Sequence, residues 1–214
     1  MTDKQLIENI SGILKRISHA ALRAGRDPEN IKLLAVTKTV GIEPIMQAVD
    51  AGLRIFGENK VQEAIRKVTS DELRATKDKI QWHLIGHLQK NKAKAAVEIF
   101  DLIQSVDSIE LAKIINSQAE KLGKKQRILL QVKLSDETSK SGIINNNLSE
   151  IVGTVREMPN LILEGLMTIP PFFENPEKSR PFFQEMRRIR DELEKKGFRL
   201  RELSMGMSND FEVG

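Results

Sequence analysis

A lysine closes the first apolar segment of this 214-residue chain, where the sequence reads Leu-Leu-Ala-Val-Thr-Lys38. A lysine in such a place is costly unless its amine reaches solvent or has a function. A desolvated, partly neutral lysine attacks an aldehyde and forms a Schiff base. The alternative is a lysine at the end of a strand that simply extends into solvent. The segment alone leaves both interpretations open.

The segment Ser204-Met-Gly-Met-Ser208 follows another apolar run and offers a different chemistry. Two hydroxyl groups and the backbone N–H groups of a loop leading into a helix suit a phosphate dianion. The alternative is an ordinary turn of small residues with a serine cap. We therefore treat this segment as a candidate phosphate-binding loop.

Further polar candidates carry weaker signals. Asn59 is either a ligand contact or the cap of the helix that follows it. His83 is either the neighbour of a ligand ring or a core histidine, and Lys140 is expected on the surface. With three histidines and no cysteine, we predict no metal site. No triad order, carboxylate pair or phosphate-loop lysine motif occurs, so we predict no catalytic residue.

Short apolar runs alternate with helical segments along the chain. The predicted strands are 31–37, 53–56, 80–85, 100–104, 127–134, 161–167 and 200–203. The predicted helices are 3–24, 43–51, 59–68, 89–98, 107–122, 147–157 and 178–196, and four of them end at Gly25, Gly52, Gly123 or Gly197. This alternation predicts parallel strands, and the strands that are apolar on both faces are expected to be covered on both sides.

Two α/β architectures fit this pattern, an open doubly wound sheet and a closed β/α barrel. Seven units in series without a glycine-rich dinucleotide fingerprint favour a (β/α)8 TIM barrel formed by one domain, residues 1–214. Such a barrel has eight strands, and residues 211–214 look like the beginning of a helix. We therefore expect the last strand to be missing from this sequence; a natural seven-stranded or open sheet is the alternative.

In a barrel the functional site lies at the carboxyl ends of the strands. The first and seventh strands are then separated by one strand, which places their ends about 10 Å apart. A small phosphorylated aldehyde fits between Lys38 and the loop at 204–208. Pyridoxal 5′-phosphate has this shape, with an aldehyde for the lysine and a phosphate for the loop.

The composition excludes several classes of protein. The formal net charge is +4 and apolar residues make up 40% of the chain, which is typical of a globular protein. The lysine-rich stretch 89–94 is most simply a charged helix face, so we expect no nucleic-acid partner. The absence of cysteine, of a signal-peptide core in residues 1–15 and of a long apolar run predicts a cytoplasmic protein that does not contact a membrane.

Seven motifs follow one another in the order of a known family. They are Lys-Leu-Leu-Ala-Val-Thr-Lys38, Phe-Gly-Glu-Asn59 with Val-Gln-Glu63, Trp82-His83-Leu-Ile-Gly-His-Leu-Gln-Lys-Asn91-Lys, Ser105-Val-Asp107, Ser139-Lys-Ser-Gly142, Gly165-Leu-Met-Thr-Ile-Pro170 and Ser204-Met-Gly-Met-Ser208. Together they resemble the pyridoxal phosphate homeostasis proteins, also called the proline-synthase co-transcribed homologue family, over essentially the whole chain.

This resemblance implies a fold similar to the N-terminal domain of bacterial alanine racemase and pyridoxal 5′-phosphate as cofactor. Lys38 matches the lysine that forms the internal aldimine, and the phosphate loop matches Ser204, Ser208 and the backbone of Gly206. The positions around the cofactor match Asn59, His83, Met167 and Thr168. The family pattern continues into a final strand with an arginine, which has no counterpart here. That departure implies either weaker cofactor binding or a longer protein.

The resemblance also implies a role in intracellular vitamin B6 homeostasis rather than enzymatic turnover. Family members are usually monomers, and apo-enzymes that require pyridoxal phosphate are candidate recipients. The alternative is a pyridoxal phosphate-dependent amino-acid racemase with weak activity. Racemisation needs an acid or base on each face of the substrate carbon, and this chain contains no tyrosine for the second face.

Overall fold

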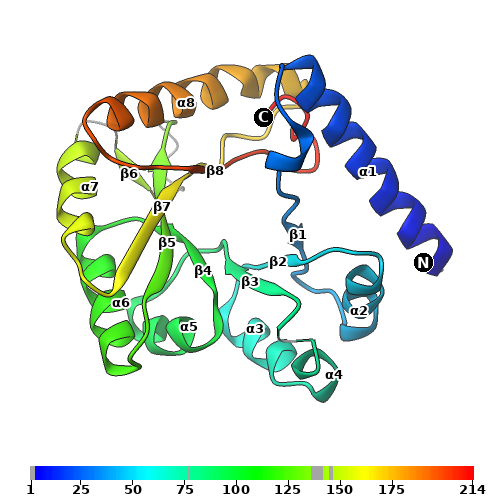
Figure 1. The fold of residues 1–214 in the computed structure, drawn as a ribbon, viewed down its shortest axis with the longest axis horizontal. Coiled ribbons are helices and arrows are strands. Elements are labelled where there is room, and N and C mark those ends of the chain that lie inside the picture. The colour runs from blue at the N-terminus through cyan, green and yellow to red at the C-terminus, as the bar shows by residue number, and fades with distance from the viewer. Residues whose placement is uncertain (1–2, 77, 136–141, 145–146) are drawn as a thin grey trace. The chain divides into compact units, whose positions relative to one another are not determined.

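Strands and helices alternate along the chain in the computed structural model, which describes residues 3–76, 78–135, 142–144 and 147–214 (Figure 1). The internal contacts group the chain into two compact units, residues 1–83 and 84–214. Among the described residues, no helix is both long enough and apolar enough to cross a membrane.

The first unit carries the segment that ends at Lys38. Its elements are α1 (Asp3–Arg23), a 3-10 turn (Pro28–Asn30), β1 (Ala35–Val36), α2 (Ile42–Asp50), β2 (Ile55–Glu58), α3 (Val61–Val68), α4 (Asp71–Arg74) and β3 (Gln81–Leu84), whose last residue begins the second unit. Strand β2 lies between β1 and β3, and the β1–β2 pair is parallel. The rings of Phe56 and Trp82 pack with their centroids 5.7 Å apart in the core of this unit.

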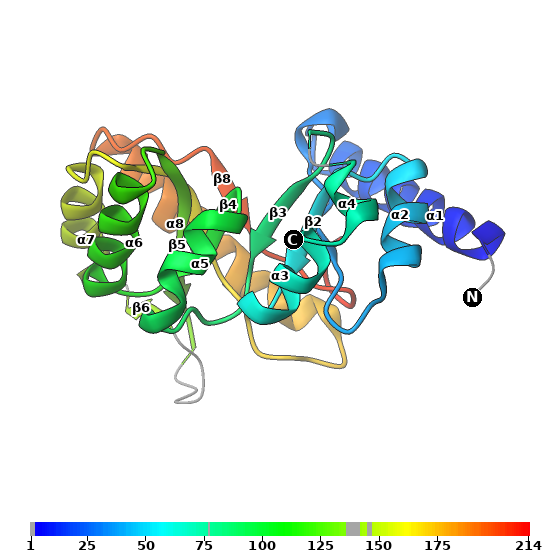
Figure 2. The same cartoon turned by 90° about the horizontal axis from the view of Figure 1, so that it is seen from below.

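The second unit carries the segment 204–208. Its elements are a 3-10 turn (Lys90–Lys92), α5 (Ala93–Ile99), β4 (Leu102–Val106), α6 (Ile109–Lys121), β5 (Gln126–Lys133), β6 (Ile143–Ile144), α7 (Leu148–Arg156), β7 (Leu161–Met167), a 3-10 turn (Pro176–Ser179), α8 (Arg180–Lys195) and β8 (Glu202–Ser204). Four strands follow in the order β4-β5-β7-β8, β6 pairs with β5, and every one of these pairs is parallel. Helices α6, α7 and α8 contact these strands (Figure 2).

One glycine lets β7 and β8 approach each other. A Cβ atom built on Gly165 would lie 1.9 Å from the carbonyl oxygen of Glu202, which is far inside van der Waals contact. Gly165 pairs with Glu202, and two residues later Met167 pairs with Ser204. The missing side chain therefore sets the register that places the carboxyl ends of these two strands side by side.

The parallel strands that the alternation predicted are confirmed, while several element boundaries are wrong. Strand β1 is two residues long rather than seven, because its ladder with β2 joins only Ala35 to Phe56 and Val36 to Gly57. Strand β6 and helix α4 were not expected, since elements of two and four residues carry almost no periodic signal. Residues 208–213 form consecutive turns instead of the expected start of a helix.

The glycines expected to end helices have the backbone that this role requires. Gly25, Gly52, Gly123 and Gly197 all adopt positive φ angles, between 61° and 98°. A residue with a side chain is strained in this left-handed region, whereas glycine enters it freely. These four helix ends were therefore predictable from local sequence alone.

Candidate functional site

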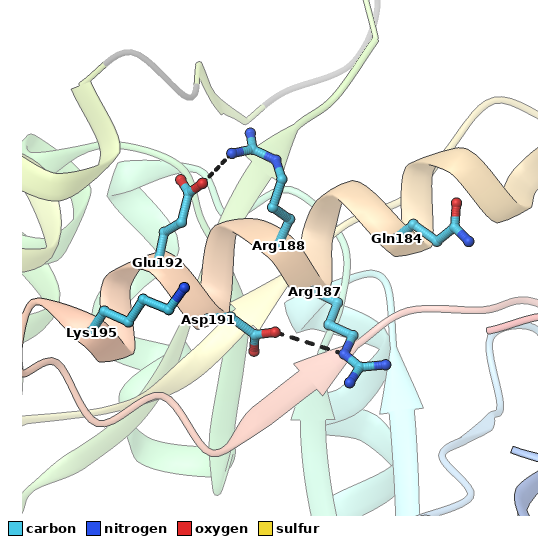
Figure 3. A pocket seen from close by; sticks show the side chains of 6 residues that line it. All are labelled: Gln184, Arg187, Arg188, Asp191, Glu192 and Lys195. Carbon is cyan, nitrogen blue, oxygen red and sulfur yellow. Dashed lines mark hydrogen bonds and ion pairs between the residues drawn. The ribbon is translucent and has the colours of Figure 1, made fainter. Parts of the chain in front are cut away.

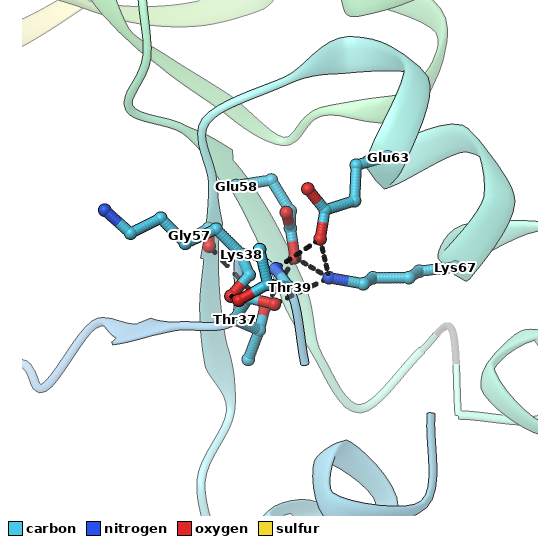
Figure 4. Close-up of polar contacts among 7 residues, drawn as sticks. All are labelled: Thr37, Lys38, Thr39, Gly57, Glu58, Glu63 and Lys67. Carbon is cyan, nitrogen blue, oxygen red and sulfur yellow. Dashed lines mark hydrogen bonds and ion pairs between the residues drawn. The ribbon is translucent and has the colours of Figure 1, made fainter. Parts of the chain in front are cut away.

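Lys38 lies two residues beyond the last residue of β1, at the carboxyl end of this strand, where the sequence predicted it. Its side chain is exposed, and Figure 4 shows it extending away from a group of polar side chains that lies beneath the same turn. A primary amine in this position is available to an aldehyde from solvent. The exposure of Lys38 does not decide between a lysine that reacts with an aldehyde and one that simply extends into solvent.

The polar group beneath Lys38 is a cluster of two carboxylates and one amine that the sequence did not predict. Lys67 of α3 donates hydrogen bonds to Oε1 of Glu58 at 2.6 Å and to Oε1 of Glu63 at 2.8 Å (Figure 4). The side chain of Glu58 is 0% exposed and that of Lys67 is 8% exposed. We call Glu58, Glu63 and Lys67 the buried ion cluster.

The buried ion cluster binds the backbone on the amino side of Lys38. Lys67 Nζ donates to the carbonyl oxygen of Thr37 at 2.6 Å, and the Thr37 hydroxyl donates to Oε1 of Glu58 at 2.6 Å. The Thr37 N–H also donates to the Gly57 carbonyl at 2.9 Å, which extends the β1–β2 pairing by one residue. Residue 37 is therefore held through its N–H, its carbonyl and its side chain.

The cluster also binds the backbone on the carboxyl side of Lys38. The N–H of Thr39 donates to Oε1 of Glu63 at 2.5 Å, and the Thr39 hydroxyl donates to the carbonyl of Lys38 at 2.6 Å. Hydrogen bonds from Lys67 and from the Thr39 N–H, in that order of effect, keep the pKa of Glu63 below its ordinary value. Glu63 is therefore a charged acceptor for the residue that follows Lys38.

The other two predicted residues of the first unit lie at or beside the ends of strands. Asn59 follows β2 and is half-buried, while Lys60 occupies the N-cap position of α3. The interpretation of Asn59 as the helix cap is therefore wrong, because the helix begins one residue later than that role requires. His83 lies in β3 and is 6% exposed, so it is a buried side chain of the strand.

The second unit brings three of its predicted residues together. Met167 and Ser204 are paired across β7 and β8, and the N–H of Thr168 donates to the Ser204 carbonyl at 3.0 Å. The Thr168 hydroxyl donates to the carbonyl of Val132, also at 3.0 Å, and the Ser204 hydroxyl donates to Oε1 of Gln104 at 2.6 Å. The carboxyl ends of β4, β5, β7 and β8 are linked by these bonds.

The loop after β8 is folded tightly around a buried carboxylate. Gly206 has a φ of +92°, and a Cβ atom on it would lie 3.0 Å from Cα of Phe211. Asp210 is 4% exposed and accepts hydrogen bonds from the Met207 N–H at 2.6 Å and from the Ser179 hydroxyl at 2.8 Å. Asp210 was not predicted, because an aspartate in a small polar segment has no distinctive spacing.

Each unit, taken by itself, carries residues that suit one reactive group of pyridoxal phosphate. In the first unit an exposed amine stands on a backbone segment that is held on both sides. In the second unit, Gly206 allows a close backbone turn between two serine hydroxyls, and that of Ser208 is on an exposed residue. An amine can take up an aldehyde, and hydroxyl and N–H donors can bind a phosphate.

Lys140 and a pocket on α8 are not part of the two groups of residues described above. Lys140, with Ser139 and Ser141, lies outside the described residues. A shallow pocket on α8 is lined by Gln184, Arg187, Arg188, Asp191, Glu192 and Lys195 (Figure 3). Its charged side chains pair along one helix, Arg188 with Glu192 and Arg187 with Asp191, and none of the predicted site residues lines it.

Comparison with known proteins supports the same fold and family. The family model described as "Alanine racemase, N-terminal domain" matches residues 13–213. A protein of Aquifex aeolicus named "Pyridoxal phosphate homeostasis protein" is 43% identical over 208 residues, covering 96% of this chain and 89% of that protein. The protein of the same name from Escherichia coli K12 is 38% identical, covering 97% of this chain and 88% of the relative.

Solved structures of other proteins have the same fold as this chain. A crystal structure of an unknown protein from Bifidobacterium adolescentis has a TM-score of 0.91 at 36% identity, covering 99% of this chain and 89% of that one. The structure of PipY from Synechococcus elongatus PCC7942 with pyridoxal phosphate (PLP) bound has a TM-score of 0.79 at 36% identity, covering 94% and 92%. An alanine racemase of Clostridium difficile, at 17% identity, a TM-score of 0.71 and coverage of 92% and 50%, shows the fold alone.

These similarities confirm the predicted α/β fold class, that of the alanine racemase N-terminal domain. The relatives named above match this chain at 38–43% identity over nearly its whole length. The chain belongs to the family of pyridoxal phosphate homeostasis proteins.

Proposed function

We propose that this protein binds pyridoxal 5′-phosphate and serves intracellular vitamin B6 homeostasis. The observation that carries the proposal is the PipY structure with PLP bound, a relative that is 36% identical over 94% of this chain. The exposed amine of Lys38 supports the same conclusion, because the backbone on both sides of this residue is held by hydrogen bonds. One family model spans residues 13–213, which supports a single binding domain over residues 1–214.

Lys38 is the residue that holds the cofactor covalently in this proposal. Bound pyridoxal phosphate supplies an electrophilic aldehyde, and the Lys38 amine is the nucleophile on this chain. The hydroxyls of Ser204 and Ser208 and the N–H of Gly206 bind the phosphate. The remaining contacts to the cofactor come from Asn59, His83, Met167 and Thr168.

The protein holds the cofactor and does not turn over an amino acid in this proposal. The curated relatives are named homeostasis proteins rather than enzymes. A racemase needs a second acid or base opposite the lysine, and the chain has no tyrosine to provide it. We further propose a cytoplasmic monomer that passes the cofactor to apo-enzymes, because the chain has no cysteine and the family name denotes homeostasis.

The test is the visible absorbance spectrum of the purified protein before and after addition of pyridoxal phosphate. We expect a yellow band that borohydride bleaches, with the reduced adduct found on Lys38 by mass spectrometry. Lys38→Ala should lose the band, while Lys79→Ala, which removes another exposed lysine of the same unit, should keep it. A borohydride-reducible adduct that persists in Lys38→Ala, or no band in the wild type, would overturn the proposal.

A further inference from the structure

We propose that Glu63, acting with Lys67 and Glu58, is a positioning residue that holds the Lys38 amine in place for the carbonyl group it captures. This inference rests on the proposed function. It concerns the buried ion cluster, which touches the backbone on both sides of Lys38 without including the Lys38 side chain (Figure 4).

The backbone after Lys38 adopts a conformation that needs outside support. Thr39 has a φ of +62°, in the left-handed region that β-branched residues avoid. Such a residue persists only where the surrounding structure holds it there. The 2.5 Å hydrogen bond from the Thr39 N–H to Oε1 of Glu63 provides that support.

The backbone before Lys38 is held by the same cluster. Lys67 joins Glu63 to the carbonyl of Thr37, and Glu58 accepts the Thr37 hydroxyl. The peptide groups on either side of Lys38 are therefore hydrogen-bonded to Lys67 and Glu63, which are bonded to each other. A shift of Glu63 or Lys67 would move both ends of the turn that carries the Lys38 amine.

Fold stability alone is a poor explanation for this cluster. Burying charges costs desolvation energy, and apolar side chains of similar volume often stabilise a fold equally well. Glu58 is fully buried, and its Oε2 atom has no hydrogen-bond partner among the described residues. A cluster that is expensive to bury, and whose directional bonds converge on the two neighbours of one lysine, is suited to fixing the geometry of that lysine.

The decisive variants change the length or the acceptor atoms of the side chain at position 63 and leave the fold intact. Glu63 lies in the first turn of α3 and its side chain is 16% exposed, so substitutions there are tolerated better than at Glu58. Glu63→Ala removes the acceptor, and Glu63→Asp keeps the charge but shortens the side chain. Glu63→Gln keeps an oxygen at the same distance and is the rescue variant.

Two control variants separate charge and stability from positioning. Glu72→Ala removes an exposed glutamate from the first turn of α4. Ser70→Ala removes the side-chain cap of α4, where the serine hydroxyl accepts from the Leu73 N–H at 3.4 Å, and so weakens the same unit away from Lys38. Unfolding by urea gives the stability of every variant.

The first readout needs no cofactor. Hydrogen–deuterium exchange measures protection of the Thr39 amide in a peptide that spans the turn. We expect faster exchange at Thr39 in Glu63→Ala and Glu63→Asp, and wild-type exchange in Glu63→Gln, Glu72→Ala and Ser70→Ala. Unchanged exchange in Glu63→Ala and Glu63→Asp would show that the Glu63 carboxylate does not hold the Thr39 amide, and this would overturn the proposal whatever the protein binds.

The second readout is the equilibrium constant for the covalent adduct with pyridoxal, which lacks the phosphate group. In that reaction the Lys38 nitrogen forms a double bond to the aldehyde carbon, and the aldehyde oxygen leaves as water with the two amine hydrogens. We expect about a fivefold loss in Glu63→Ala and Glu63→Asp, the effect of one net hydrogen bond on the ordering of the amine. The three other variants should stay near the wild type.

The two readouts distinguish failure of this proposal from failure of the proposed function. Faster exchange in Glu63→Ala with an unchanged equilibrium constant for the adduct would show that the hydrogen bond between Thr39 and Glu63 does not position Lys38. A loss of adduct in Ser70→Ala as large as that in Glu63→Ala would attribute the effect to stability and also overturn the proposal. If the wild type forms no adduct with pyridoxal or with pyridoxal phosphate, the proposed function is wrong and positioning of a reactive Lys38 falls with it.

Discussion

Among the residues around Lys38, the buried charges of Glu58 and Lys67 have the largest expected effect on stability. Glu58 is fully buried and its carboxylate is matched by the Lys67 amine at 2.6 Å. Removing Glu58 would take one acceptor from the buried Lys67 amine and the acceptor of the Thr37 hydroxyl, while Lys67 would keep its bond to Glu63. The stability of this unit should therefore depend strongly on the side chain at position 58.

Glu58→Ala should lower the free energy of unfolding by about 1–3 kcal/mol, the usual cost of taking the hydrogen-bond partner from a buried polar group. Glu58→Gln should cost less, because an amide oxygen can still accept from Lys67 and Thr37. Urea denaturation measures both. Exposed Glu72 provides the matched control, since Glu72→Ala should change stability by about 0.5 kcal/mol or less. Equal effects of the alanine variants at positions 58 and 72 would contradict the cluster as described.

The lowered pKa of Glu63 predicts how stability depends on pH. Its folded pKa lies below the ordinary value of 4.5 because it accepts from Lys67 and from the Thr39 N–H. A group whose pKa is depressed by folding stabilises the fold above its unfolded pKa, and this contribution is lost as the pH falls through the folded pKa. The wild type should therefore lose stability below about pH 4.5 more steeply than Glu63→Gln.

Unfolding free energies from pH 7 down to pH 3 test this prediction for the two proteins. The difference between wild type and Glu63→Gln should be constant near neutrality and should shift against the wild type in acid. A difference that stays constant down to pH 3 would show that Glu63 does not contribute through its charge.

At the scale of elements, the close approach of β7 and β8 positions the second group of site residues. Met167, Thr168 and Ser204 are neighbours only because Gly165 lets the backbone of Glu202 come near. The loop after β8 then turns at Gly206 and is tied to the segment before α8 through Asp210 and Ser179. Both features concern the backbone more than the chemistry of the side chains.

Gly165→Ala should destabilise the protein by about 2 kcal/mol or more, because overpacking against a backbone atom cannot be relieved by a rotamer change. Gly153→Ala is the matched control. Gly153 lies within α7, and a Cβ atom there would meet only a Phe198 ring atom at 3.9 Å. This second change should stabilise the protein by about 0.5–1 kcal/mol through helix propensity. Thermal or urea unfolding that gives the same sign for both variants would refute the account of β7 and β8.

Asp210→Ala should weaken phosphate binding while sparing the chemistry of Lys38. The carboxylate orients the loop through the Met207 N–H and the Ser179 hydroxyl. Without it, we expect affinity for pyridoxal phosphate to fall about tenfold, with little change for pyridoxal. Spectroscopic titration with both compounds measures this difference, and Glu174→Ala, at an exposed position of the same unit, is the control. An equal loss for both compounds would place the effect elsewhere.

For the molecule as a whole, a fold shared with alanine racemase does not by itself imply racemase activity. Racemisation needs acid–base groups on two faces of the substrate, and this chain contains no tyrosine. The purified protein, loaded with pyridoxal phosphate, should therefore interconvert alanine enantiomers far more slowly than an ordinary enzyme rate of about 10 per second. Chiral chromatography of the product measures the rate, and turnover near that value would contradict a holding role.

Much of the fold could be predicted because its signals are local. The alternation of apolar runs and helical segments, and the glycines that end four helices, depend on residues a few positions apart. Short elements such as α4 and β6 were missed, because two to four residues hold too little periodicity. The sequence left Asn59 as either a ligand contact or a helix cap, and the cap alternative is wrong because the helix begins after Lys60.

The alternating α/β pattern, the parallel strands and the family motifs that single out Lys38 and the segment 204–208 could all be predicted from the amino-acid sequence. The contact of Lys67 with the carbonyl of Thr37, 30 positions earlier, and the hydrogen bond that Asp210 accepts from Ser179, 31 positions earlier, arise only in the folded chain. A buried charge takes whichever partners the packing of distant elements provides, and no local spacing encodes these partners.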